Sequence, residues 1–119
     1  MKIAITSSGK DLDAQVDPRF GRAAYIIVVD TDTLDFEVID NSENKNAFKG
    51  AGITAASAIC DKEAQVLITG FCGPNAFKTL DSAGVKVAND AAGTVRSTIE
   101  DYNAGKFTFA DSANVDGHW

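Results

Sequence analysis

The sequence predicts a single α/β domain, built as one mixed five-stranded sheet with helices on its faces. Short apolar runs rich in β-branched residues alternate with segments of helical period in the second half of the chain. The 119 residues suit one domain, and the 45% hydrophobic and 24% charged fractions are those of an ordinary globular protein. The composition therefore excludes a disordered or fibrous chain, and we expect residues 1–119 to form one domain.

The first half of the chain predicts three strands. Residues 2–6 alternate in polarity, and Tyr25–Asp30 is a nearly continuous apolar run that indicates a buried strand. A short turn at 31–33 leads from this run into a third strand at 35–40. The second and third strands are therefore expected to form a β-hairpin.

The second half of the chain predicts three helices. The first begins at Gly50, and its many alanines favour close packing against a sheet. Its expected inward face carries Ile53, Ala56 and Ile59. The second helix begins at Pro74, since proline suits a first position where no amide bond is lost, and it ends at Gly84. The third helix spans 94–103.

The order of these elements predicts how the sheet is connected. Two further short strands, at 65–69 and 85–88, separate the helices, and their βα units require parallel crossovers. One mixed sheet of order 3-2-1-4-5, a ribonuclease H-like topology, accommodates these units together with the hairpin. The first and fourth strands are then neighbours, and ligands of open α/β sheets bind at such carboxyl ends.

Charge and cysteine content limit the partners and the compartment. The net charge is −6, so we expect neither nucleic acid nor an anionic membrane as a partner, because both require a dense basic surface. No apolar run is long enough to span a bilayer, and the N-terminus has no signal-peptide core, which favours a cytoplasmic protein. Cys60 and Cys72 lack a CxxC spacing, and we expect both to be reduced thiols.

Two glycine-rich segments are candidates for anion binding at the predicted switch point. The loop after the first strand contains Ser8, Gly9 and Lys10, and the turn at 70–74 leads into a helix N-terminus. Free amides and the helix dipole favour an anion there. The residues 50–52 offer a second glycine-rich helix start. The alternative interpretation is that these glycines merely permit tight turns.

The segment 16–23, with the sequence VDPRFGRA, is the most distinctive string in the chain. It carries Arg19 and Arg22, and guanidinium groups can grip an oxyanion or a sulfide-rich cluster without titrating. Phe20 lies between the arginines and is expected to limit the access of water. The alternative is that Asp17 pairs with one arginine and the loop simply packs on the sheet.

Several motifs, taken together, resemble the dinitrogenase iron–molybdenum cofactor-binding family. The matching strings are VDPRFGRA at 16–23, KGAGI at 49–53, GFCGPNAF at 70–77, TVR at 94–96 and NVDGHW at 114–119. That family includes NifX, NafY, the C-terminal part of NifB and stand-alone members of the orange-protein type. The resemblance implies a ribonuclease H-like fold and a carrier, storage or insertion role for a metal–sulfur cluster. It implies molybdenum, in a cluster of the iron–molybdenum or the molybdenum–copper sulfide type.

The predicted site combines the switch-point residues with the motifs. Its cofactor-binding residues are Ser8, Gly9, Lys10, Arg19, Phe20, Arg22, Lys49, Gly50, Gly52, Phe71 and Gly73. Cys72 and His118 are candidate metal ligands. The helix after Cys72 would lower the pKa of its thiol, although Cys72 could instead be a small buried residue, as we expect of Cys60. His118 is the only histidine. We favour a preformed cluster held by arginine, lysine and backbone amides, since one cysteine is too few for an ordinary iron–sulfur centre.

The sequence offers no catalytic residues, and we expect the chain not to be an enzyme. Two-metal nucleases on this fold need carboxylates on the central strands, and the strands at 2–6 and 65–69 contain none. A Ser–His–Asp triad would have to use His118. The expected partners are the cluster and proteins that donate or accept it. The alternative is a cluster-free interaction or regulatory module on the same fold.

Overall fold

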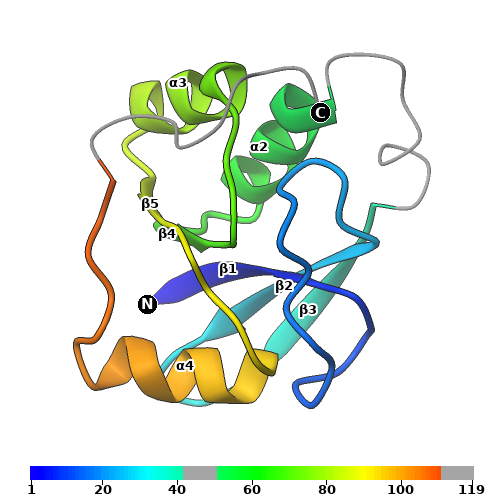
Figure 1. Cartoon of the computed structure of the whole chain (residues 1–119), viewed down its shortest axis with the longest axis vertical. Helices are drawn as coiled ribbons and strands as arrows, with labels where there is room; N and C mark the ends of the chain where they lie inside the picture. The colour runs from blue at the N-terminus through cyan, green and yellow to red at the C-terminus, as the bar shows by residue number, and fades with distance from the viewer. Residues whose placement is uncertain (42–50, 111–119) are drawn as a thin grey trace.

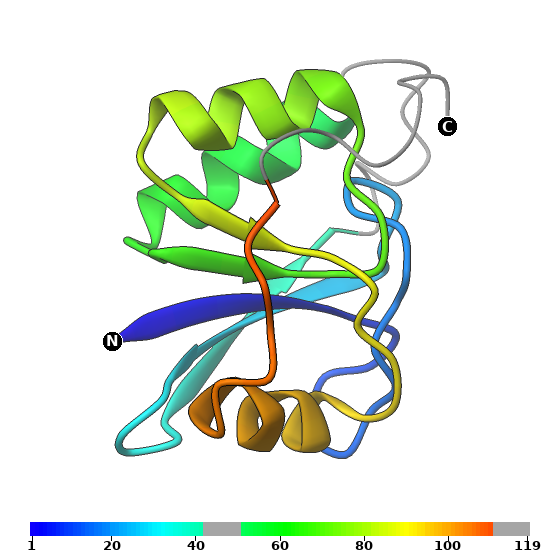
Figure 2. The same cartoon turned by 60° about the vertical axis from the view of Figure 1, so that its left-hand side comes forward.

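The computed structural model describes residues 1–41 and 51–110, and Figures 1 and 2 show its elements from two sides. Its strands form one five-stranded sheet of order β3-β2-β1-β4-β5, which confirms the predicted order. The strands are β1 (Lys2–Ser7), β2 (Tyr25–Asp30), β3 (Phe36–Asp40), β4 (Val66–Ile68) and β5 (Lys86–Ala88). Because β1 pairs antiparallel with β2 and parallel with β4, the sheet is mixed, as predicted.

Helices cover both faces of the sheet (Figure 2). Those of the described residues are α2 (Ala51–Asp61), α3 (Pro74–Ser82) and α4 (Val95–Asn103). α2 and α3 lie side by side on one face, and α4 lies on the other. Successive strand residues point to opposite faces, so Ala4 packs with α2 and α3 while Ile3 and Ile5 pack with α4. No helix within residues 1–41 and 51–110 is both long and apolar enough to span a membrane.

α2 and α3 approach each other closely through small residues. A Cβ added to Gly52 would lie 2.9 Å from the Cβ of Ala76, so glycine permits this approach. The buried residues of α2 are Ala51, Ala55, Ala56 and Ile59. The prediction that Ile53 also faces inward is wrong, because its side chain is 43% exposed. Ile53 lies about 100° around the helix from Gly52, which faces α3.

Beyond α4 the chain returns to the outer edge of β5. The amide of Ala110 donates to the carbonyl of Val87 at 2.7 Å, and Phe109 forms an isolated bridge with Ala88. This contact was not predicted, because the residues after 105 show no clear period. It covers part of the β5 edge, whereas β3 forms the other border of the sheet.

Candidate functional site

Two buried threonines mark the switch point between β1 and β4. The hydroxyl of Thr6 donates to the carbonyl of Asp17 at 2.6 Å, and the hydroxyls of Thr6 and Thr69 are 2.9 Å apart. Since the proton of Thr6 is directed at Asp17, Thr69 donates to Thr6. Both residues are fully buried, so this chain of hydrogen bonds fixes the loop to the sheet. The pair was not predicted from the sequence, where its only signal is a threonine at the end of each apolar run.

The segment 17–22, which we call the arginine loop, runs beside the segment 70–73, which we call the cysteine turn. The amide of Phe71 donates to the carbonyl of Pro18 at 2.7 Å, and the amide of Phe20 donates to the carbonyl of Phe71 at 3.1 Å. A Cβ on Gly70 would lie 2.7 Å from the Pro18 oxygen. The two distinctive motifs of the sequence are therefore joined backbone to backbone.

Asn41 anchors the other end of the arginine loop. Its side-chain amide donates to the carbonyls of Gly21 at 3.1 Å and Ala23 at 2.8 Å, and the residue is buried. Gly21 has a φ of +92°, and a Cβ there would lie 2.9 Å from the backbone of Gly52. Sequence reasoning missed Asn41 as well, because an asparagine after a strand predicts no more than a turn.

Arg19 is the most accessible cation of the arginine loop. Its side chain is 54% exposed, and its Nε lies 3.8 Å from Oδ1 of Asp17. The same carboxylate oxygen accepts a hydrogen bond from the Arg19 amide at 3.1 Å. The predicted alternative, in which Asp17 pairs with an arginine, is thus present, yet half of the Arg19 side chain still faces solvent. Arg22 is half-buried, and its amide donates to the carbonyl of Arg19 at 3.2 Å.

The two phenylalanines of the predicted site lie in different environments. Phe71 is 39% exposed, whereas Phe20 is buried in the core beneath α2 and α3. We expected Phe20 to lie at the surface between the arginines, and the structure shows that it does not. Arg19 forms an isolated parallel β-bridge with Phe71. In an extended segment of this kind, neighbouring side chains point to opposite sides, so Arg19 and Phe20 face in opposite directions.

Cys72 is a core residue in this conformation. Its side chain is buried, and Sγ donates weakly to the carbonyl of Gly73 at 3.7 Å. Burial raises the pKa of the Cys72 thiol to about 12, so the prediction of a lowered pKa is wrong. Desolvation of the thiolate outweighs the dipole of α3. Cys60 packs against the same core, as predicted, and burial raises its pKa too.

Polar groups of the loop that contains Ser8, Gly9 and Lys10 contact other residues of the same chain. The Ser8 amide and hydroxyl both donate to the carbonyl of Gln15, at 2.9 and 3.1 Å. The Gly9 amide donates to the hydroxyl of Ser7 at 3.1 Å, so it is already engaged. The ammonium of Lys10 lies 5.5 Å from the ring centroid of Tyr25. These contacts place the loop at the β1–β2 side of the sheet.

The start of α3 adds backbone amides beside the arginine loop. Gly73 is the N-cap without a side-chain cap, and Pro74 occupies the first turn, as predicted. The amide of Asp90 donates to the carbonyl of Gly70 at 3.0 Å, which brings the loop after β5 against the cysteine turn. In this loop Oδ1 of Asn89 is buried and has no hydrogen-bond partner within residues 1–41 and 51–110. Of the predicted site residues, Lys49, Gly50 and His118 lie outside the described residues.

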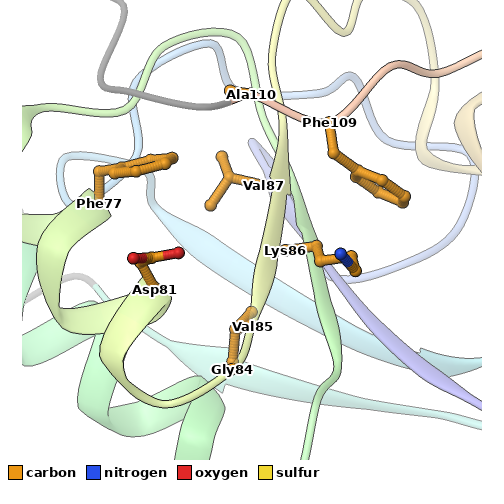
Figure 3. A pocket seen from close by; sticks show the side chains of 8 residues that line it. All are labelled: Phe77, Asp81, Gly84, Val85, Lys86, Val87, Phe109 and Ala110. Atoms are coloured by element: carbon orange, nitrogen blue, oxygen red, sulfur yellow. The ribbon is translucent and has the colours of Figure 1, made fainter.

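No metal cage coincides with these loops in the part of the chain that the structure describes. No three His, Cys, Asp or Glu side chains gather there in a way that could hold a metal ion. A pocket of about 280 Å³ lies between α3 and β5 (Figure 3). It is lined by Phe77, Asp81, Gly84, Val85, Lys86, Val87, Phe109 and Ala110. None of the predicted site residues contributes to this pocket.

Comparison with known proteins gives the chain its family. Residues 1–105 match the family model described as dinitrogenase iron-molybdenum cofactor. The chain belongs to this family. The matched span contains every predicted site residue except His118.

Solved structures of related sequence have the same fold. The apo form of the orange protein from Desulfovibrio gigas is 43% identical over 96% of each chain, with a TM-score of 0.92. A putative NifB protein from Thermotoga is 36% identical over 98% of each chain, with a TM-score of 0.83. A putative dinitrogenase from Methanocaldococcus jannaschii, 18% identical over 94% of this chain and 96% of its own, shows the fold alone at a TM-score of 0.70. No curated protein matches the chain.

Proposed function

We propose that the chain binds an anionic, molybdenum-containing metal–sulfur cluster and acts as its carrier, storage or insertion protein. The observation that carries this proposal is the joined pair of arginine loop and cysteine turn at the carboxyl ends of β1 and β4. It places Arg19, whose side chain is half-exposed, in a parallel bridge with the exposed Phe71. Membership of the family and the likeness to the orange protein support molybdenum as the metal.

Binding in this proposal is electrostatic. Arg19 and Arg22 neutralise the sulfides of the cluster, and amides at the start of α3 add hydrogen bonds. Because the chain carries a net charge of −6, an anion needs such locally placed cations. Phe71 shields one side of the cluster from water. Lys10 and Lys49 supply further positive charge, and His118 remains a candidate ligand from outside the described residues.

A thiolate bond from Cys72 would require the cysteine turn to open. The thiol is buried and its pKa is raised to about 12, so ionisation at neutral pH is unfavourable in this conformation. We therefore favour a preformed cluster without a covalent cysteine bond. The cluster itself is either of the iron–molybdenum type or of the molybdenum–copper sulfide type.

Cluster uptake by purified protein tests the proposal. The chain is incubated with salts of molybdenum, copper or iron together with sulfide, and uptake is followed by visible absorption and by metal and sulfide analysis. Arg19→Ala combined with Arg22→Ala should weaken uptake about a hundredfold or more, because each of the two lost charge-assisted hydrogen bonds is worth roughly 1.5–3 kcal/mol. Lys2→Ala combined with Lys106→Ala removes the same charge. Lys2 is at the amino end of β1 and Lys106 follows α4, so this control should retain uptake.

Two outcomes would overturn parts of the proposal. If the arginine variant takes up the cluster like the control, the site assignment is wrong. If wild-type protein stays colourless with every metal and also with a molybdenum–sulfur cluster supplied preformed, the cluster-free interaction module is favoured. Cys72→Ala separates the modes of binding, since electrostatic binding predicts unchanged uptake and a thiolate bond predicts its loss.

A further inference from the structure

Among the described residues, no strand lies against the outer side of β3. β3 is the border strand of the sheet and, in the part of the chain that the structure describes, pairs with β2 alone (Figures 1 and 2). The amide of Asp30 donates to the carbonyl of Asp35 at 2.9 Å, which makes these residues a hydrogen-bonded pair. Hydrogen-bonded and non-hydrogen-bonded pairs alternate in antiparallel strands, so Glu37 bonds towards β2 while Phe36 and Val38 direct their N–H and C=O groups outwards.

The side chains along this border are apolar and accessible. Leu34, Phe36 and Val38 are 42%, 40% and 36% exposed, although all three are large hydrophobic residues. Phe36 and Val38 pair with Val29 and Ile27, whose side chains belong to the core on the α4 face. Phe36 and Val38 therefore lie on the same face of the sheet as α4, next to the buried core on that face. The strand contains neither lysine nor proline, the residues with which proteins commonly protect a sheet edge.

The charge of this border indicates what kind of strand it can accept. Residues 23–41 contain five acids, namely Asp30, Asp32, Asp35, Glu37 and Asp40, and no lysine or arginine. The N-terminal amine lies 3.7 Å from Asp32, and Lys62 lies 3.3 Å from Glu37. Asp35 makes no ion pair with any of the described residues. A second copy of this acidic strand would be repelled, whereas a basic strand would be attracted.

We propose that the outer side of β3 docks an extended, basic segment of a partner protein, which adds a sixth strand to the sheet. Main-chain hydrogen bonds to Phe36 and Val38 supply affinity, as in other cases of strand addition. Residues opposite Phe36 and Val38 share their face and should be apolar. Residues opposite Asp35 and Glu37 lie on the other face and should be lysine or arginine. The partner segment thus alternates apolar and basic residues.

This interaction is compatible with the proposed cluster site. Phe36 lies opposite Val29, near the amino end of β1, whereas the arginine loop lies beyond its carboxyl end. A partner bound at the start of β3 therefore leaves Arg19 accessible. The inference goes beyond the proposed function, and its test needs no cluster, so the two proposals can fail separately.

A synthetic peptide of alternating lysine and valine, about nine residues long, is a suitable probe. Hydrogen exchange followed by NMR should show that saturating peptide slows the amides of Phe36 and Val38 about tenfold or more, because they become paired. The amide of Glu37, already bonded towards β2, should change little. A peptide of alternating glutamate and valine should bind at least about tenfold more weakly.

Two matched variants localise the binding. Val38→Lys places a positive charge at the border of β3, and Ile53→Lys makes the same change at an exposed apolar residue of α2. Val38→Lys should weaken peptide binding about tenfold or more, and Ile53→Lys should leave it nearly unchanged. Equal binding by the two variants would overturn the proposal. So would concentration-dependent protection of Phe36 and Val38 without peptide, which would indicate pairing between copies of this chain.

Discussion

At the carboxyl ends of β1 and β4 the chain closes on itself, whereas β3 leaves one side of its backbone open. In the first region the amides of Phe20 and Phe71 bond across the two loops, and Gly70 touches Pro18. In the second, the outward groups of Phe36 and Val38 have no partner among the described residues. Both regions are accessible. The loops of the first bond to each other through their backbones, whereas β3 bonds to β2 on one side alone among the described residues.

This difference separates two ways of recognising a partner. A fixed backbone can present a few side chains, such as Arg19 and Phe71, in a constant arrangement, which suits a rigid anionic ligand. An open strand recognises through the main chain and adapts to any sequence of the right pattern. Substitutions should therefore destabilise the carboxyl edge strongly and the β3 border only weakly.

The largest expected effect is that of Gly70→Ala. The added Cβ would lie 2.7 Å from the oxygen and 2.8 Å from two carbons of Pro18, so the arginine loop would have to move. We expect a loss of about 3 kcal/mol in the free energy of unfolding, the upper range for overpacking. Urea denaturation followed by circular dichroism measures it.

Gly84→Ala is the matched control for this substitution. Gly84 has a φ of +78°, and no atom of the described residues lies within 4 Å of an added Cβ, so the backbone conformation is what opposes alanine. That strain costs about 1 kcal/mol. Equal losses in the two variants would mean that contact with Pro18 does not hold the loop.

The next largest effect should come from Asn41→Ala. This change removes both of the buried hydrogen bonds that the Asn41 side chain donates to Gly21 and Ala23. The expected loss is about 2 kcal/mol. Asn103→Ala, at the exposed end of α4, should change stability by less than about 0.5 kcal/mol in the same denaturation experiment. A small effect of Asn41→Ala would show that the arginine loop does not depend on this anchor.

The buried thiol of Cys72 should make stability depend on alkaline pH. Its pKa is raised from 9.0 to about 12, so the folded state keeps the proton that the unfolded state loses. This contribution is complete below pH 9 and is lost as the pH rises towards 12. At pH 10 the loss should be on the order of 1 kcal/mol. Because tyrosines and lysines also titrate there, the measurement is the difference between wild type and Cys72→Ala, and parallel pH profiles would contradict it.

The sequence predicted the elements and their order because hydrophobic periodicity, and glycines at the ends of helices and strands, are local signals. It also predicted which motifs meet, since βα units place the loops after neighbouring parallel strands at one edge. It could not predict that Phe20 is buried while Arg19 is exposed. That alternation arises only because the arginine loop pairs like a strand with Phe71, a partner about fifty residues away.

The same reason explains the other differences. Ile53 was expected inside because its spacing fits a helix face, but the close contact between Gly52 and Ala76 decides which face is buried. Thr6, Thr69 and Asn41 are buried polar residues, and their burial is favourable only with partners that are distant in sequence. Local patterns therefore predicted which loops lie together, and long-range contacts determine which of their side chains reach the surface.

The smallest expected effect is that of Lys62→Met, which tests the β3 border. The Nζ of Lys62 lies 3.3 Å from Oε2 of Glu37, but the two side chains are 46% and 59% exposed. Solvent and salt screen such a pair, and flexible side chains lose entropy in forming it, so its removal should change stability by less than about 0.5 kcal/mol. Denaturation at low and high salt should give nearly the same difference between variant and wild type. A much larger loss would mean that this ion pair holds β3 in place, and the border would then be as fixed as the carboxyl edge.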